Sequence, residues 1–147
     1  MPGRYVLAAA VVVALVGLPG CGEDPDAVAC DVLTRLEASA DPLGDAVLGN
    51  PTRLRTASAD IVATYDELDR VAPSALRSDT RRLSDTYRTI DALFATVGYD
   101  AAALEASPVA AARLRELTGP AFQSSVGAVV RFGIANCGIT VVGRPAP

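Results

Sequence analysis

The sequence predicts an all-α protein, an up-down-up-down four-helix bundle with short connecting helices, behind an N-terminal leader. Apolar residues recur at helical spacing over most of residues 27–138, prolines and glycines separate these stretches, and an apolar run precedes them at residues 5–18. Helices joined by short connectors pack most economically as antiparallel neighbours, so four main helices form one bundle within a single domain.

The first two main helices are expected over residues 26–40 and 52–72. In the first, apolar side chains recur every three or four residues, at Ala29, Val32, Leu33, Leu36 and Ala40. The second carries a heptad-like stripe of Leu54, Ser58, Ile61, Tyr65, Leu68 and Ala72. Residues 41–51 contain two prolines and two glycines, so they form a connector with at most a brief helical turn over 42–48.

The third main helix has the longest stripe. Pro73 suits its first turn, and Gly98 is a natural C-terminal stop. The stripe between them consists of Leu76, Thr80, Leu83, Tyr87, Ile90, Phe94 and Val97.

The C-terminal part is expected to hold broken helix over residues 100–118 and a last main helix over 120–137. Asp100 and Ser107 are suitable N-caps for two short connecting helices. The inner face of the last helix is expected to be Phe122, Val126, Val130, Gly133 and Cys137.

The first twenty residues have the layout of a secretory signal peptide. Arg4 gives a positive start to the apolar run 5–18. The run has fourteen residues, which reach about 21 Å as a helix, short of the roughly 30 Å hydrocarbon layer. It is therefore expected to be a leader rather than a permanent membrane span.

The end of the leader resembles the lipobox of bacterial lipoproteins. Leu18, Gly20 and Cys21 match that pattern, and Pro19 departs from it at a position where the family usually has Ala, Ser, Thr or Val. The resemblance implies cleavage after Gly20 and a lipid anchor on Cys21, with the domain held outside a cell membrane. The alternative is ordinary signal cleavage that leaves Cys21 as a free thiol.

Cysteine counting agrees with the lipid anchor, because an exported chain with three cysteines leaves one of them unpaired. With Cys21 lipidated, Cys30 and Cys137 remain. An even number of antiparallel helices places these two at the same end of the bundle, so we expect a disulfide between them; the alternative is two separately buried thiols. The expected divisions are a leader at 1–20, a lipidated acidic tether at 21–26, the bundle at 27–138 and a disordered tail at 139–147.

The composition argues against several kinds of chemistry. The formal net charge is -4 and the basic residues are interleaved with acidic ones, which does not favour nucleic acid as a partner. The chain has no histidine, so we predict no catalytic residues and no enzyme. No metal-binding or nucleotide-binding motif is present, so no metal and no cofactor is predicted.

One cluster of carboxylates and two aromatic residues are candidate functional groups. Asp66, Glu67 and Asp69 are either a cation or general-acid site or, as we prefer, a polar helix face. Tyr65 and Tyr87 lie on the predicted stripes, so we interpret them as core residues rather than as a ligand site.

The residues that carry a family resemblance are Cys30, Tyr65, Leu68, Ala72, Pro73, Leu83, Tyr87, Ile90, Asn136, Cys137 and Gly138. With them, residues 28–138 resemble a class of small exported helical lipoproteins of actinobacteria that has no known activity. The resemblance implies a helical bundle in the cell envelope and transfers no functional residue.

The leading hypothesis for function is a non-enzymatic envelope module. Its partners are expected to be the membrane, through lipid on Cys21, and an envelope protein or cell-wall component. The alternative is a helical bundle with an internal cavity for a small molecule or lipid, because a core rich in Ala, Gly and Val can leave unfilled volume.

Overall fold

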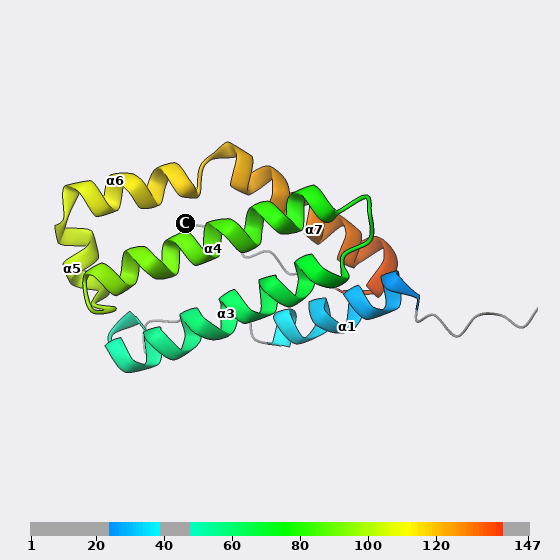
Figure 1. Ribbon diagram of the computed structural model, residues 1–147, viewed down its shortest axis with the longest axis horizontal. Helices are drawn as coiled ribbons and strands as arrows, with labels where there is room; N and C mark the ends of the chain where they lie inside the picture. Colours follow the sequence, from blue (N-terminus) through cyan, green and yellow to red (C-terminus); the bar gives the residue numbers. More distant parts are fainter. Residues whose placement is uncertain (1–23, 39–47, 140–147) are drawn as a thin grey trace, which may run out of the picture.

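The computed structural model describes residues 24–38 and 48–139, and these contain six α-helices and no strand (Figure 1). The prediction of an all-α protein is confirmed. The helices are α1 (Pro25–Ala38), α3 (Pro51–Val71), α4 (Arg77–Thr96), α5 (Ala101–Ala106), α6 (Pro108–Leu117) and α7 (Pro120–Cys137).

Two long antiparallel helices, α3 and α4, form the body of the molecule, and α1 and α7 pack on them (Figure 1). One end of the molecule holds the start of α1, the end of α7 and the α3–α4 connection at residues 72–76; we call it the disulfide end. The opposite end carries α5, and we call it the α5 end. From there α6 runs back beside α4.

The starts of three helices are fixed by side chains that accept hydrogen bonds from backbone N–H groups. Asn50 caps α3 by accepting from the backbone N–H of Arg53, and Pro51 follows it in the first turn. Asp100 and Ser107 cap α5 and α6 in the same way. The predicted broken helix over residues 100–118, with its two starts, is therefore confirmed.

The predicted stripes of α3 and α4 form much of the core. Leu68 and Leu83 have no exposed surface, and Leu54 is 1% exposed. On α1, Ala29, Val32 and Leu33 are buried as expected, whereas Ala40 lies outside the described residues. The same holds for residues 42–47 of the brief turn expected over 42–48, and for the leader and lipobox at 1–21.

The beginning of α4 differs from the prediction. Residues 73–76 form a turn, closed by a hydrogen bond from the Leu76 N–H to the Pro73 carbonyl, and the helix begins at Arg77. The buried side chain of Leu76 holds this turn against the core, and its carbonyl accepts from the N–H groups of both Asp79 and Thr80. Pro73 is therefore placed before the helix and not in its first turn.

The inner face of α7 is rotated relative to the predicted one. Phe122 and Gly133 are buried as expected, but Ser125 and Val129 occupy the centre of the face, and Val126 and Val130 are half-buried at its side. The rotation follows from packing, because α7 contacts both α1 and α4 and its buried face is set by two neighbours.

The chain beyond α7 contributes one residue to the core that was expected to begin the tail. Gly138 ends the helix with φ of 64°, the left-handed conformation that favours glycine. This turn lets the Ile139 N–H donate to the Gly133 carbonyl and buries the Ile139 side chain. Ile139 is therefore part of the folded domain, and residues 140–147 lie outside the described part.

Candidate functional site

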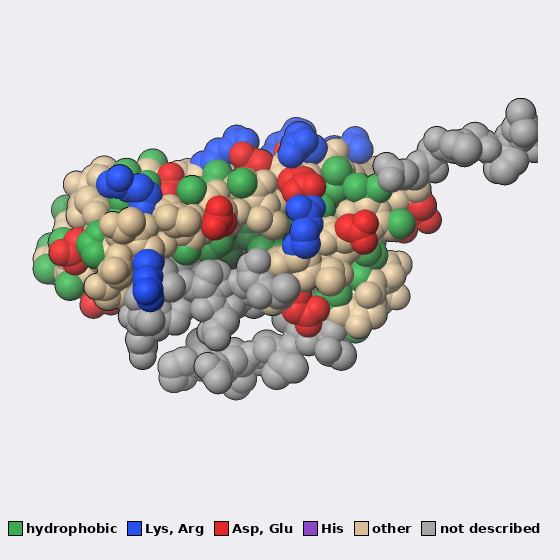
Figure 2. Space-filling model, turned by 90° about the horizontal axis from the view of Figure 1, so that it is seen from below, with side chains coloured by type: hydrophobic (Ala, Val, Ile, Leu, Met, Phe, Trp, Pro, Cys, Tyr) green, Lys and Arg blue, Asp and Glu red, His purple; other side chains and the backbone are tan. Residues whose placement is uncertain are grey.

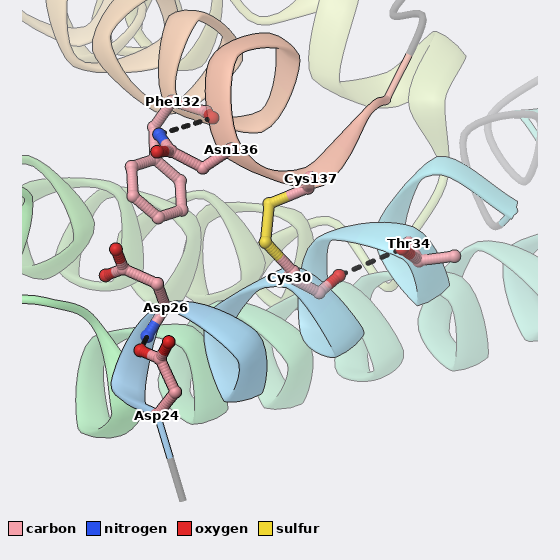
Figure 3. Close-up of a disulfide and its surroundings, with 7 residues drawn as sticks. All are labelled: Asp24, Asp26, Cys30, Thr34, Phe132, Asn136 and Cys137. Carbon is pink, nitrogen blue, oxygen red and sulfur yellow. Dashed lines mark hydrogen bonds between the residues drawn. A yellow bond between two sulfur atoms is a disulfide. The ribbon is translucent and has the colours of Figure 1, made fainter.

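The two cysteines of the folded domain are joined, as the helix arrangement predicts. Cys30 on the second turn of α1 and Cys137 at the last residue of α7 form a disulfide with a Cα–Cα distance of 5.2 Å (Figure 3). The bond closes a loop across 107 residues of sequence. The first and last helices are thus covalently linked at the disulfide end.

The helix turns around the disulfide are held by local hydrogen bonds (Figure 3). The Thr34 hydroxyl donates to the Cys30 carbonyl, and the Asn136 side-chain amide donates to the Phe132 carbonyl. At the start of α1, the backbone N–H of Asp26 donates to the Asp24 carboxylate. These bonds are local to single helices, and the disulfide is the link between α1 and α7 in this region.

The carboxylates of the cluster on α3 bind side chains of different neighbouring helices. Asp66 accepts from the Ser84 hydroxyl at 2.6 Å and pairs with Arg88 at 2.9 Å, both on α4. Glu67 pairs with Arg35 of α1 at 2.7 Å. These contacts make the cluster a set of helix-to-helix links.

Two carboxylates of this cluster have pKa values below their ordinary range. Desolvation raises the pKa of Asp66, but the hydrogen bonds from Ser84 and Arg88, together with the charges of Arg88 and Arg70, outweigh it and lower the pKa. The hydrogen bond from Arg35 lowers the pKa of Glu67. Both groups are therefore stabilised as charged acceptors, which disfavours the general-acid role considered for the cluster.

Asp69, the third member, accepts from the Thr80 hydroxyl of α4 at 3.2 Å and lies 3.7 Å from the Arg81 guanidinium. In the ranges 24–38 and 48–139, no group of three or more Cys, Asp or Glu side chains is placed to hold a metal ion. The geometry gives no support to the cation site considered for Asp66, Glu67 and Asp69.

Hydroxyl-to-carboxylate hydrogen bonds between helices recur along the bundle. Besides those to Asp66 and Asp69, Ser58 of α3 donates to Asp91 of α4 at 2.6 Å, and Ser125 of α7 donates to Asp79 of α4 at 2.8 Å. In each pair, the hydroxyl of a serine or threonine that faces the core donates to an aspartate carboxylate at the edge of the helix interface. Such charge-assisted bonds are stronger than bonds between neutral groups, so they help to set the register of the helices.

These pairs were not predicted from the sequence, although part of the signal was present. Ser58 and Thr80 lie on the predicted stripes, and a buried hydroxyl requires a hydrogen-bond partner. The identity of the partner depends on the alignment of two helices, which the spacing within one helix does not give.

The two tyrosines of the stripes form an aromatic cluster, which agrees with the interpretation that they are core residues. The rings of Tyr65 and Tyr87 stack with centroids 4.3 Å apart, and Tyr87 meets Phe122 of α7 edge-on at 5.6 Å. Burial raises the pKa of both phenols above the usual tyrosine value. Neither hydroxyl is therefore suited to acid–base chemistry near neutral pH.

The described surface has an open groove between α4 and the junction of α6 with α7, which we call the α4–α6 groove. It consists of two adjoining hollows of about 350 and 330 Å³ that share Arg82, Thr86 and Leu117. Arg82 makes no hydrogen bond or ion pair with the described residues, whereas Arg113 at the rim pairs with Glu116 at 2.6 Å. The walls of the groove are mostly polar, with apolar surface from Leu117, Pro120 and Phe122, and the Arg82 guanidinium is available to a partner.

The face of the molecule shown in Figure 2 has a mixed surface. Acidic and basic side chains both occur across the described part of the face in Figure 2. None of the helices in the described ranges is long and apolar enough to cross a membrane.

No family model, no curated protein and no solved structure matches this chain.

Proposed function

We propose that this chain is a membrane-anchored lipoprotein of the cell envelope whose helical domain is a non-enzymatic interaction module. The observation that carries the anchoring is the Cys30–Cys137 disulfide. The sequence has three cysteines, so once these two are joined only Cys21 is left, directly after the lipobox-like Leu18, Pro19 and Gly20. Disulfides persist in oxidising compartments, which also favours an exported protein.

The interaction role is supported by the structural contacts that the carboxylates of the bundle make. The carboxylates of Asp66, Asp69, Asp79 and Asp91 accept hydrogen bonds between helices, so they stabilise the fold. The α4–α6 groove is open to solvent, which suits contact with an envelope protein or wall component better than enclosure of a small apolar ligand.

The anchor is tested by replacing Cys21 in the full chain expressed in a bacterium that processes lipoproteins. With Cys21→Ala, we expect the precursor to stay uncut, or the mature protein to leave the membrane fraction, with loss of metabolically incorporated acyl label. Equal membrane retention of the variant, together with an unlabelled wild type, would contradict the proposal.

The partner is tested by crosslinking in cells from single photoreactive residues. We compare position 78, at the rim of the α4–α6 groove, with the exposed position 63 on α3. A discrete adduct formed from position 78 and absent from position 63 supports the interaction role. Release of a bound small molecule from the purified domain in native mass spectrometry, with no adduct in cells, would favour the ligand-binding alternative.

As a finer description of the architecture, we propose that α1, α3, α4 and α7 are an up-down-up-down bundle, with α5 and α6 as its connecting segment. The support is a closed series of contacts, α1 to α3, α3 to α4, α4 to α7 and α7 back to α1. NMR contacts between Leu33 and Gly133, and between Tyr87 and Phe122, test the two neighbours of α7 independently.

A further inference from the structure

The proposed anchor is separated from the folded domain by very little chain. Cys21 lies three residues before Asp24, the first described residue. Three residues span at most about 11 Å even when fully extended. If Cys21 carries the lipid, as proposed above, the start of α1 is held next to the headgroup layer.

The start of α1 is firmly joined to the rest of the domain. Asp24 accepts from the Val28 N–H with its carbonyl and from the Asp26 N–H with its side chain, at 3.1 and 3.0 Å. One turn further, the disulfide between Cys30 and Cys137 ties α1 to α7. The tether therefore positions the whole bundle and not a loose helix.

The bundle is long compared with the tether. Helix α3 has 21 residues, so it extends about 31 Å between the two ends of the molecule. Figure 1 shows the start of α1, the end of α7 and the α3–α4 connection together at one end, with α5 at the other. A domain standing on its tether thus keeps the α5 end about 30 Å farther from the membrane.

Three arginines near the disulfide end are exposed, and their side chains make no hydrogen bond or ion pair with the described residues. Arg70 is the penultimate residue of α3, Arg77 is the first residue of α4, and Arg131 lies in the last two turns of α7. The charge of Arg70 also acts on Asp66 and Glu67, and the Arg131 guanidinium lies beside Gly127 on the preceding turn of α7. Asp24 and Asp26 share this end, so its net charge is not strongly positive. Guanidinium groups nevertheless bind phosphate well, and basic side chains are attracted to an anionic membrane surface.

We propose that the disulfide end faces the phospholipid headgroups, with Arg70, Arg77 and Arg131 contacting their phosphates. The α5 end points away from the membrane. Both statements depend on the lipid anchor at Cys21, and each describes a placement that the anchor alone does not fix, because a tethered bundle could also lie flat.

The placement is tested with the lipidated mature protein in vesicles that contain phosphatidylglycerol. A fluorophore is attached through Ser74→Cys at the disulfide end or through Ala102→Cys on α5, both exposed positions, without reducing the native disulfide. Energy transfer to an acceptor on the lipid headgroups is then measured. We expect strong transfer from position 74 and much weaker transfer from position 102. Equal transfer, or stronger transfer from position 102, would overturn the proposal.

The role of the arginines is tested by the triple variant Arg70→Gln, Arg77→Gln and Arg131→Gln. We expect the difference between the two labelled positions to shrink, because each lost contact weakens the upright state by roughly five-fold. The matched control is Arg53→Gln, an exposed arginine near the α5 end, which should leave the difference unchanged. An unchanged difference in the triple variant would refute the arginine contacts.

Mass spectrometry of the same protein separates the two proposals. A mature chain without acyl groups would refute the lipoprotein proposal and, with it, the proposed end-on placement. An acylated chain that gives equal transfer from both positions would refute the end-on placement alone.

Discussion

The two ends of the α3–α4 pair are held together by different forces. Toward the disulfide end, α1 and α7 cover the pair, Leu68 and Leu83 are fully buried, and Tyr65 and Tyr87 stack against each other. Toward the α5 end, Leu54 and Leu104 are buried as well. There, polar contacts add to the packing: Asp91 of α4 accepts hydrogen bonds from the hydroxyls of Ser58 and Tyr99, and the Arg55 guanidinium lies over the Tyr99 ring at 5.0 Å.

This difference predicts where the domain is most stable. Complete burial of a large apolar side chain contributes about 1.5–3 kcal/mol, whereas a hydrogen bond contributes about 1 kcal/mol net. The disulfide adds a covalent link only at its own end. We therefore expect the disulfide end to be the last part to unfold, and the α5 end to open first and to show faster amide hydrogen exchange.

The largest effect is expected from a charge placed in the apolar end. Leu83→Asp buries an unpaired carboxylate where the native side chain has no exposed surface, so it should cost about 4 kcal/mol or more and unfold the domain. Circular dichroism and thermal melting measure this. Arg82→Asp on the exposed neighbouring position is the control and should be nearly silent. Similar melting of the two variants would show that the buried face of α4 is wrongly assigned.

The second effect separates covalent from non-covalent stabilisation. Cys30→Ser opens a loop of 107 residues, so we expect the free energy of unfolding to fall by about 2–5 kcal/mol while most helical signal remains. Reduction of the wild type should have the same effect, and reduction of the variant should have none. Peptide mapping without reduction checks the bond itself, and free thiols at both positions in exported material would contradict the arrangement.

The third effect concerns the α5 end. Ser58→Ala removes one of the two hydroxyl donors to Asp91 and should cost about 1 kcal/mol. Tyr99→Phe removes the other, and the double variant should show coupling because both donors share one acceptor. Chemical denaturation measures the energies, and hydrogen exchange should quicken in the last turns of α4 but not in α1. Strict additivity would indicate that the cluster does not act as a unit.

The features of this fold that sequence could predict are mainly local. Asn50, Asp100, Ser107 and Gly138 act within one turn of the chain, so the ends of helices could be predicted from single residues. The stripes of α3 and α4 could also be predicted, because each helix buries one face against a regular partner. The disulfide followed from the number and direction of the helices.

Features that depend on the relation between helices could not be predicted in this way. The face of α7 is turned toward Ser125 and Val129 because two helices share it, and the burial of Ile139 depends on a turn that returns the chain to Gly133. The α4–α6 groove around Arg82 exists only because α6 runs back beside α4. Its residues are far apart in sequence and carry no common motif.

The smallest effect is an acid dependence of stability that originates at Asp66, near the middle of the α3–α4 pair. Hydrogen bonds from Ser84 and Arg88 outweigh desolvation and hold the pKa of Asp66 below its ordinary value, which is about 3.9 in an unfolded chain. A lowered folded-state pKa contributes stability that is fully present above the unfolded value and is lost as the pH falls through the folded value. Ser84→Ala removes one of the stabilising donors, so the pKa of Asp66 should rise and part of this acid-dependent stability should disappear. Urea unfolding across acidic pH, with NMR titration of the Asp66 carboxyl, measures both quantities.

The control is Asp60→Asn, which changes a carboxylate whose side chain makes no hydrogen bond or ion pair with the described residues. If Ser84→Ala leaves the titration midpoint of Asp66 unchanged, the hydroxyl-to-carboxylate pairs are packing contacts without an electrostatic role, and the contrast between the two ends rests on burial alone.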